Sequence, residues 1–119
     1  MVELIEKKSK FYGYCFDVYS ADDVEKILEN IKKENKKCTH ICYAYSIASD
    51  VVLVKAVDDG EPSGTAGRPI LNVIEKKNLK NVMVVVIRYF GGIKLGAGGL
   101  VRAYTKSASE AIKEKLGKW

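Results

Sequence analysis

The chain has 119 residues, of which 47% are hydrophobic and 29% charged, a length and composition that predict one globular domain with its own core. Its formal net charge of +5 favours anionic partners such as nucleic acid, although a solvated, lysine-rich surface explains the same value. No hydrophobic run is long enough to span a membrane, and residues 1–10 lack the apolar core of a signal peptide, so we expect a cytoplasmic protein without a membrane partner.

The three cysteines are an odd number and fit no disulfide framework. Cys38, His40 and Cys42 would share one face of a strand, which raises the alternative of a metal site. Three ligands on one strand seldom close a tetrahedral site, and the sequence offers no second ligand cluster. We therefore expect reduced, buried thiols, no metal site and no cofactor.

The first third of the chain predicts a short strand over 2–7, a strand rich in aromatic residues over 10–19, and a helix. Ser20 followed by Asp23 is typical of a helix N-terminus in which the serine hydroxyl caps the backbone. Hydrophobic residues then recur at helical spacing, which predicts a helix that ends near Asn35.

The middle of the chain predicts two strands, over 40–48 and 51–57, that are joined by a turn at Ser49 and Asp50. A polar loop rich in Gly and Pro follows over 58–69, and then a second helix that ends around Lys77. The nearly continuous hydrophobic run over 81–88 predicts a strand that is buried on both faces.

The last predicted helix runs from 98 to 116. The order of elements predicts an α+β fold: a two-layer α/β sandwich with the helices on one face of a mixed sheet. Tyr12 and Tyr14 would share one side of their strand, as would Tyr43 and Tyr45. If this aromatic face were open, it would suit base stacking, a second domain or a homodimer contact; we favour the alternative that the rings pack under the helices.

Residues 84–104, VVVIRYFGGIKLGAGGLVRAY, lead from a strand through a glycine-rich loop into the last helix. A loop that opens a helix leaves free N–H groups, and Lys94 and Arg102 would add positive charge, so an anion site is one interpretation. The alternative, a tight turn whose glycines serve packing, has equal weight. The spacing of the glycines matches neither the phosphate loop of nucleotide hydrolases nor the dinucleotide fingerprint.

The glycine-rich loop and the 58–69 loop both leave the sheet from strand ends, so we predict that they meet on one patch. The candidate anion- or nucleic-acid-binding residues are Arg68, Arg88, Lys94, Gly98, Gly99, Arg102 and Lys106. The 58–69 loop contributes Asp58, Asp59, Gly60, Glu61, Pro62, Ser63, Gly64 and Thr65.

The carboxylates of this patch would repel a phosphate unless they were paired. We favour a structural role in which Asp59 and Glu61 cap a helix and form salt bridges with Arg68 or Arg88, over a protein-contact role, metal binding or acid–base chemistry. Ser63 and Thr65 are expected to cap rather than to act as nucleophiles, because the one histidine is expected on a distant strand. No catalytic residue is assigned.

Four segments of the sequence resemble motifs of the YigZ/IMPACT family: DDGEPSGTAGRPIL (58–71), RYFGGIKLGAGGLVRAY (88–104), KKSKF (7–11) and THICYAY (39–45). The resemblance implies a fold like domain 2 of ribosomal protein S5, with a left-handed βαβ crossover. It also implies a single YigZ/IMPACT-type domain over 1–119. Bacterial members of the family typically carry a further ferredoxin-like domain at the carboxy terminus, so the chain is either a single-domain member or one whose second domain has been cut away.

Three functions follow from the residues and the resemblance. We expect first an RNA- or ribosome-binding domain linked to translation or its regulation, because of the ribosomal type of fold and the positive charge. The second expectation is a protein-interaction adaptor in translational control. The third, an enzyme acting on a phosphorylated small molecule, depends only on the kinases that share the fold.

Overall fold

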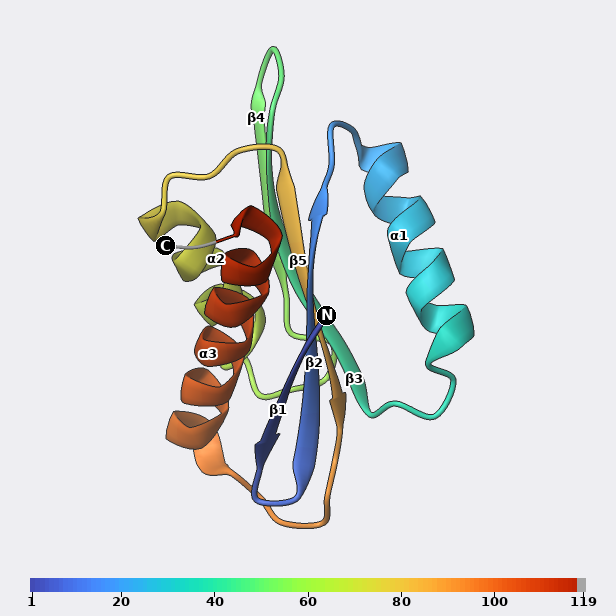
Figure 1. The fold of residues 1–119 in the computed structure, drawn as a ribbon, viewed down its shortest axis with the longest axis vertical. Coiled ribbons are helices and arrows are strands. Elements are labelled where there is room, and N and C mark those ends of the chain that lie inside the picture. Colours follow the sequence, from blue (N-terminus) through green and yellow to red (C-terminus); the bar gives the residue numbers. More distant parts are fainter. Residues whose placement is uncertain (118–119) are drawn as a thin grey trace.

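The computed structural model describes residues 1–117, which form five strands and three helices (Figure 1). In chain order these are β1 (Val2–Glu6), β2 (Ser9–Asp17), α1 (Ala21–Glu34), β3 (His40–Ala48), β4 (Val52–Val57), α2 (Gly67–Lys76), β5 (Val82–Tyr89) and α3 (Gly96–Leu116). Each predicted element is present, with its ends shifted by three residues or fewer. The predicted cap of α1 is confirmed, because the Ser20 side chain accepts a hydrogen bond from the Asp23 N–H.

The strands form one sheet in the order β1-β2-β5-β3-β4, and every neighbouring pair is antiparallel. The α+β class is therefore confirmed, but the prediction of a mixed sheet is wrong. The physical reason is that β5, the last strand in the sequence, lies between β2 and β3 and pairs with both. The strands β2 and β3 run parallel to each other, but they are not hydrogen-bonded to each other because β5 lies between them.

The helices lie on both faces of the sheet, so the prediction of helices on one face is also wrong. α1 lies on one side, and α2 and α3 lie together on the other (Figure 1). Side chains alternate along β5: Val84 and Val86 pack in the core with α2 and α3, whereas Val85 and Ile87 pack in the core that includes Ile31 of α1. Two small cores on opposite faces thus share one central strand.

This arrangement gives the fold two crossovers of opposite hand. The segments β2-α1-β3 and β4-α2-β5 each join parallel strands across one intervening antiparallel strand. A half-turn about an axis perpendicular to the sheet places the strands of one crossover on those of the other, but the two helices cover opposite faces of the sheet. One crossover must therefore be left-handed, which is rare among βαβ units and agrees with the expectation above.

The aromatic face is the one that α1 partly covers. Tyr12, Tyr14 and Phe16 are half-buried against the core that contains α1, and the rings of Tyr14 and Phe16 are stacked with centroids 5.9 Å apart. Much of this face is thus packed under a helix, as the favoured alternative predicts. A homodimer through the remainder stays a prediction.

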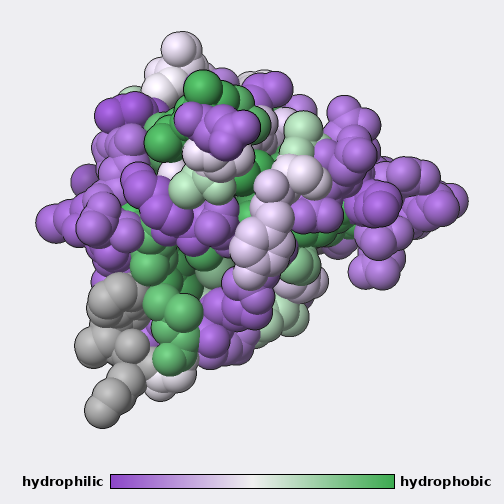
Figure 2. All heavy atoms as spheres, turned by 90° about the horizontal axis from the view of Figure 1, so that it is seen from above, coloured by the Kyte–Doolittle hydropathy of each residue, from purple (hydrophilic) through white to green (hydrophobic). Residues whose placement is uncertain are grey.

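The hairpin of β3 and β4 projects from one end of the molecule (Figure 1). β4 is an edge strand, and Val51, Val52, Leu53 and Val54 are 41–65% exposed. Figure 2, which looks at the molecule from this end, shows hydrophobic side chains exposed beside the hydrophilic outer side of α1. None of the helices in residues 1–117 is long and hydrophobic enough to cross a membrane.

Candidate functional site

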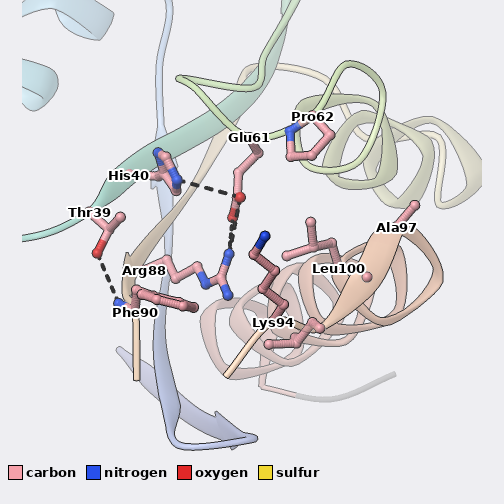
Figure 3. Close-up of a pocket in the computed structure, with 11 residues that line it drawn as sticks. Thr39, His40, Glu61, Pro62, Arg88, Phe90, Lys94, Ala97 and Leu100 are labelled. Carbon is pink, nitrogen blue, oxygen red and sulfur yellow. Dashed lines mark hydrogen bonds and ion pairs between the residues drawn. The ribbon is translucent and has the colours of Figure 1, made fainter. Parts of the chain in front are cut away.

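A hollow of about 400 Å³ lies where the 58–69 loop meets the loop between β5 and α3, so the predicted convergence of these loops is present (Figure 3). All four sequence segments that carry the family resemblance lie in its wall or directly behind it. The residues that line it are Thr39, His40, Glu61, Pro62, Arg88, Phe90, Lys94, Leu95, Gly96, Ala97 and Leu100.

Asp58 fixes the first loop by capping α2. Its carboxylate accepts hydrogen bonds from the backbone N–H groups of Gly64 (2.9 Å), Ala66 (3.1 Å) and Gly67 (2.8 Å). Burial alone would raise the pKa of Asp58, but these three hydrogen bonds outweigh it and hold the pKa below its ordinary value. The helix cap is therefore Asp58, and the prediction that Asp59 and Glu61 cap a helix is wrong.

Glu61 is the centre of a buried network under the hollow. Its carboxylate accepts hydrogen bonds from Arg88 Nη1 at 2.8 and 3.0 Å and from the Tyr104 hydroxyl at 2.5 Å. The side chains of Glu61 and Arg88 are only 3% and 6% exposed. The predicted salt bridge between Glu61 and an arginine is thus formed with Arg88, which is consequently not a free surface cation.

Tyr104 and Cys42 extend this network into the core. The Cys42 thiol donates to the Asp58 carbonyl oxygen at 3.0 Å and lies 3.4 Å from the Tyr104 hydroxyl. Burial raises the pKa of Cys42 to about 12 and raises that of Tyr104 far above its ordinary value. Both groups are therefore neutral, and neither has the properties of a nucleophile near neutral pH.

His40 belongs to the site, although it was expected on a distant strand. The antiparallel register places it opposite Arg88. Its Nδ1 lies 2.7 Å from the Asp59 carbonyl oxygen, which can only accept, and its Nε2 lies 3.5 Å from Glu61 Oε1 (Figure 3). Asp59 itself accepts a hydrogen bond from the Ile41 N–H at 2.7 Å. Among residues 1–117 no group of His, Cys, Asp and Glu side chains is placed to hold a metal ion.

Two hydroxyl groups fasten the glycine-rich loop to the sheet. Ser9 Oγ accepts hydrogen bonds from Arg88 Nη2 at 3.2 Å and from the Gly91 N–H at 3.1 Å, and Thr39 Oγ1 accepts from the Phe90 N–H at 2.9 Å. A Cβ atom at Gly91 would lie 2.0 Å from the Lys8 carbonyl oxygen, so only glycine fits there. The β1–β2 turn therefore packs directly against the glycine-rich loop.

The start of α3 faces the hollow with its backbone uncovered. Gly96, at φ +73°, turns the chain into the helix, and in the described part of the chain no side chain caps it. Because α3 begins at Gly96 rather than at 98, the free N–H groups of its first turn include Gly96, Ala97 and Gly98, whereas the Gly99 N–H stands where the first helical hydrogen bond forms.

The remaining predicted cations lie in two other places. Arg102 and Lys106 join Lys7 around a second, smaller hollow of about 250 Å³, which shares Leu95 with the first and is also lined by Gly99. Arg68 lies on α2, exposed, with its guanidinium 3.6 Å from Glu75. The predicted patch is thus two adjacent hollows, with Arg68 in neither.

Comparison with known proteins places this geometry in a family. The model of the Impact N-terminal domain matches residues 7–112. The chain belongs to the IMPACT family. It is 49% identical over 110 residues to "IMPACT family member YvyE" of Bacillus subtilis, a match that covers 92% of this chain and 51% of that protein. The chain spans about half the length of the curated bacterial relatives it matches.

Two solved structures of similar fold extend the comparison. One, described as a crystal structure of a hypothetical protein, has a TM-score of 0.90 and 33% sequence identity, and the match covers 95% of this chain and 56% of that one. The other is Yih1, described as a two-domain translational regulator; its TM-score is 0.62 and its identity 26%, over 94% of this chain and 44% of that one. Of these two proteins, Yih1 is the one whose description names a role in translation.

Proposed function

We propose that this IMPACT domain binds RNA, on the ribosome or elsewhere, and acts in translation or its regulation in the cytoplasm. The observation that carries the proposal is the cluster of Lys7, Arg102 and Lys106 around the second hollow, with Lys94 at the first. All four side chains are exposed, and within residues 1–117 none of them forms an ion pair. Unpaired lysine and arginine side chains on one surface are the usual partners of backbone phosphates.

The relatives support the same direction. Yih1 is described as a translational regulator, and the net charge of +5 favours a polyanionic partner. Arg102 and Lys106 are one helical turn apart on α3, so both cations extend from the same side of the helix. A phosphate backbone that followed this side of α3 would meet the two in succession.

The test is a fluorescence titration of labelled structured RNA across salt concentrations. We expect binding that weakens steeply with salt, and Arg102→Ala should lower the affinity and reduce the slope by about one phosphate contact. The matched control is Lys26→Ala, which removes one exposed cation from α1 on the opposite face of the sheet. Affinity that is absent, or indifferent to both salt and Arg102, would contradict the proposal.

A protein partner is the second candidate, and one observation favours it. The edge strand β4 exposes Val52 and Val54 together with its unpaired backbone groups, which suits the addition of a strand from another protein. Such binding should persist at high salt and be lost in Val54→Lys, whereas Arg102→Ala should leave it unchanged.

A further inference from the structure

The three helices of the domain differ in how their N-termini are satisfied. Ser20 caps α1, and the Asp58 carboxylate caps α2. α3 has no acidic residue in its first turn and no capping side chain among residues 1–117, and Gly96 and Ala97 line the first hollow. Free N–H groups and the positive end of the helix dipole therefore border a cavity of a size typical of ligand sites.

Arg88 adds a fixed positive group to the wall of the hollow. Its side chain is 6% exposed, and Figure 3 shows its guanidinium group beside the Glu61 carboxylate. Of its five N–H donors, those on Nη1 and Nη2 are held by Glu61 and Ser9, and the buried Nε has no partner among the described residues. These hydrogen bonds keep the guanidinium in one position, so its charge stays in the wall of the hollow.

The charges around the hollow fit a singly charged anion. Arg88 and Lys94 are cationic and Glu61 is anionic, so these three side chains together carry one net positive charge. In Figure 3 the side chain of Lys94 points toward Glu61 from the side opposite His40. A phosphodiester carries one negative charge, whereas a terminal phosphate carries nearly two at pH 7.

Phe90 provides an apolar surface beside these charges. Its side chain is 46% exposed, and the Arg88 guanidinium lies 5.3 Å from the centre of its ring. Arg88 is itself held by Glu61 and Ser9, so the ring rests on a fixed support. An exposed aromatic ring on a rigid base is the usual platform for an unstacked RNA base.

From these four observations we propose that the first hollow holds one nucleotide of single-stranded RNA. Its phosphodiester lies at the N-terminus of α3 beside Lys94, and its base stacks on Phe90. The proposal rests on the RNA-binding function proposed above and adds the place and the strandedness of the RNA. Single-stranded RNA, rather than a free nucleotide, is favoured because the second hollow adjoins the first at Leu95, so a strand that leaves Phe90 continues over Arg102 and Lys106.

The test is the anisotropy of a short, labelled oligouridylate titrated with the domain and five variants. Phe90→Ala should weaken binding about tenfold, and Phe90→Tyr, which keeps a ring, should restore it. Lys94→Gln should weaken binding and reduce the salt slope by about one contact. The matched controls are Ile93→Ala, at a neighbour outside the hollow that is 42% exposed, and Lys26→Gln; both should bind as the unaltered domain does.

The outcomes separate the two proposals. If the unaltered domain binds no RNA, the proposed function fails and the nucleotide site fails with it. If it binds RNA but Phe90→Ala and Lys94→Gln match their controls, the nucleotide site is wrong and the RNA-binding function stands. If free uridine monophosphate competes as well as the oligouridylate does, the hollow serves a small nucleotide and the assignment to RNA is overturned. Movement of the Gly96 and Ala97 amide resonances on addition of oligouridylate would support the site directly.

Discussion

Neutralising Glu61 should destabilise the domain more than almost any other single substitution of a charged residue. Glu61→Gln keeps the shape of the side chain but leaves Arg88, 6% exposed, without its counter-charge. It also replaces one acceptor oxygen by an NH₂ donor, so the hydrogen bonds that Arg88 and Tyr104 donate to the carboxylate are weakened or lost. Breaking a buried ion pair from one side costs about 3–5 kcal/mol, a large part of a typical total of about 5–15 kcal/mol.

Urea unfolding followed by far-UV circular dichroism would measure this loss. The control is Arg68→Ala, which breaks the exposed pair with Glu75 and should cost about 0–1 kcal/mol. Adding Arg88→Met to Glu61→Gln removes the uncompensated cation, so the double variant should be more stable than Glu61→Gln alone. The reasoning is refuted if Glu61→Gln shifts the midpoint no further than Arg68→Ala does.

Three further predictions concern the cap, the start of α3 and the buried thiol. The pKa of Asp58 is lowered in the folded state, so the contribution of Asp58 to stability is complete above the ordinary value of about 3.9 and is lost as the pH falls below that value. Asp58→Asn should reduce the free energy of unfolding at pH 7 by about 1–2 kcal/mol. In urea titrations at acid pH, the stability of this variant should also depend less on pH than that of the unaltered domain. Gly96→Ala should lower the free energy of unfolding by about 1 kcal/mol because Gly96 has φ +73°. Gly98→Ala, inside the helix, should raise it by about 0.5–1 kcal/mol. Equal effects of the two substitutions in thermal unfolding would show that the first turn is assigned wrongly. Cys42, with its pKa raised to about 12 by burial, should react with iodoacetamide at pH 8 only after urea unfolds the domain, and rapid alkylation of the native protein would contradict its placement.

Local patterns predicted the elements well because each depends on neighbouring residues. Ser20 and Asp23 defined the start of α1, and the hydrophobic run before Arg88 predicted a strand buried on both faces, which β5 is. The strand order was not predictable in the same way. Nothing in the segment 81–88 indicates that it lies between β2 and β3, and that position makes every neighbouring pair antiparallel. The face of the sheet on which α1 packs is likewise not indicated by any local pattern.

The site was predictable in part for the same reason. The meeting of the two loops and the pairing of Glu61 with an arginine followed from the residue types. The place of His40 did not, because it depends on the register between β3 and β5, which sets His40 opposite Arg88. The choice of Asp58 over Asp59 as the cap of α2 depends on loop geometry that two adjacent, chemically identical side chains cannot reveal.

The attachment of Ser9 to Arg88 and Gly91 has a consequence for how the domain folds. These hydrogen bonds join residues 79 and 82 positions apart, and they need β5 already in place beside β2. Contacts that close such long loops form late in folding, because the chain must lose most of its conformational entropy before these contacts can form. The hollow therefore cannot exist in a partly folded chain, and any ligand of the hollow binds only the native state and raises the unfolding temperature with its concentration.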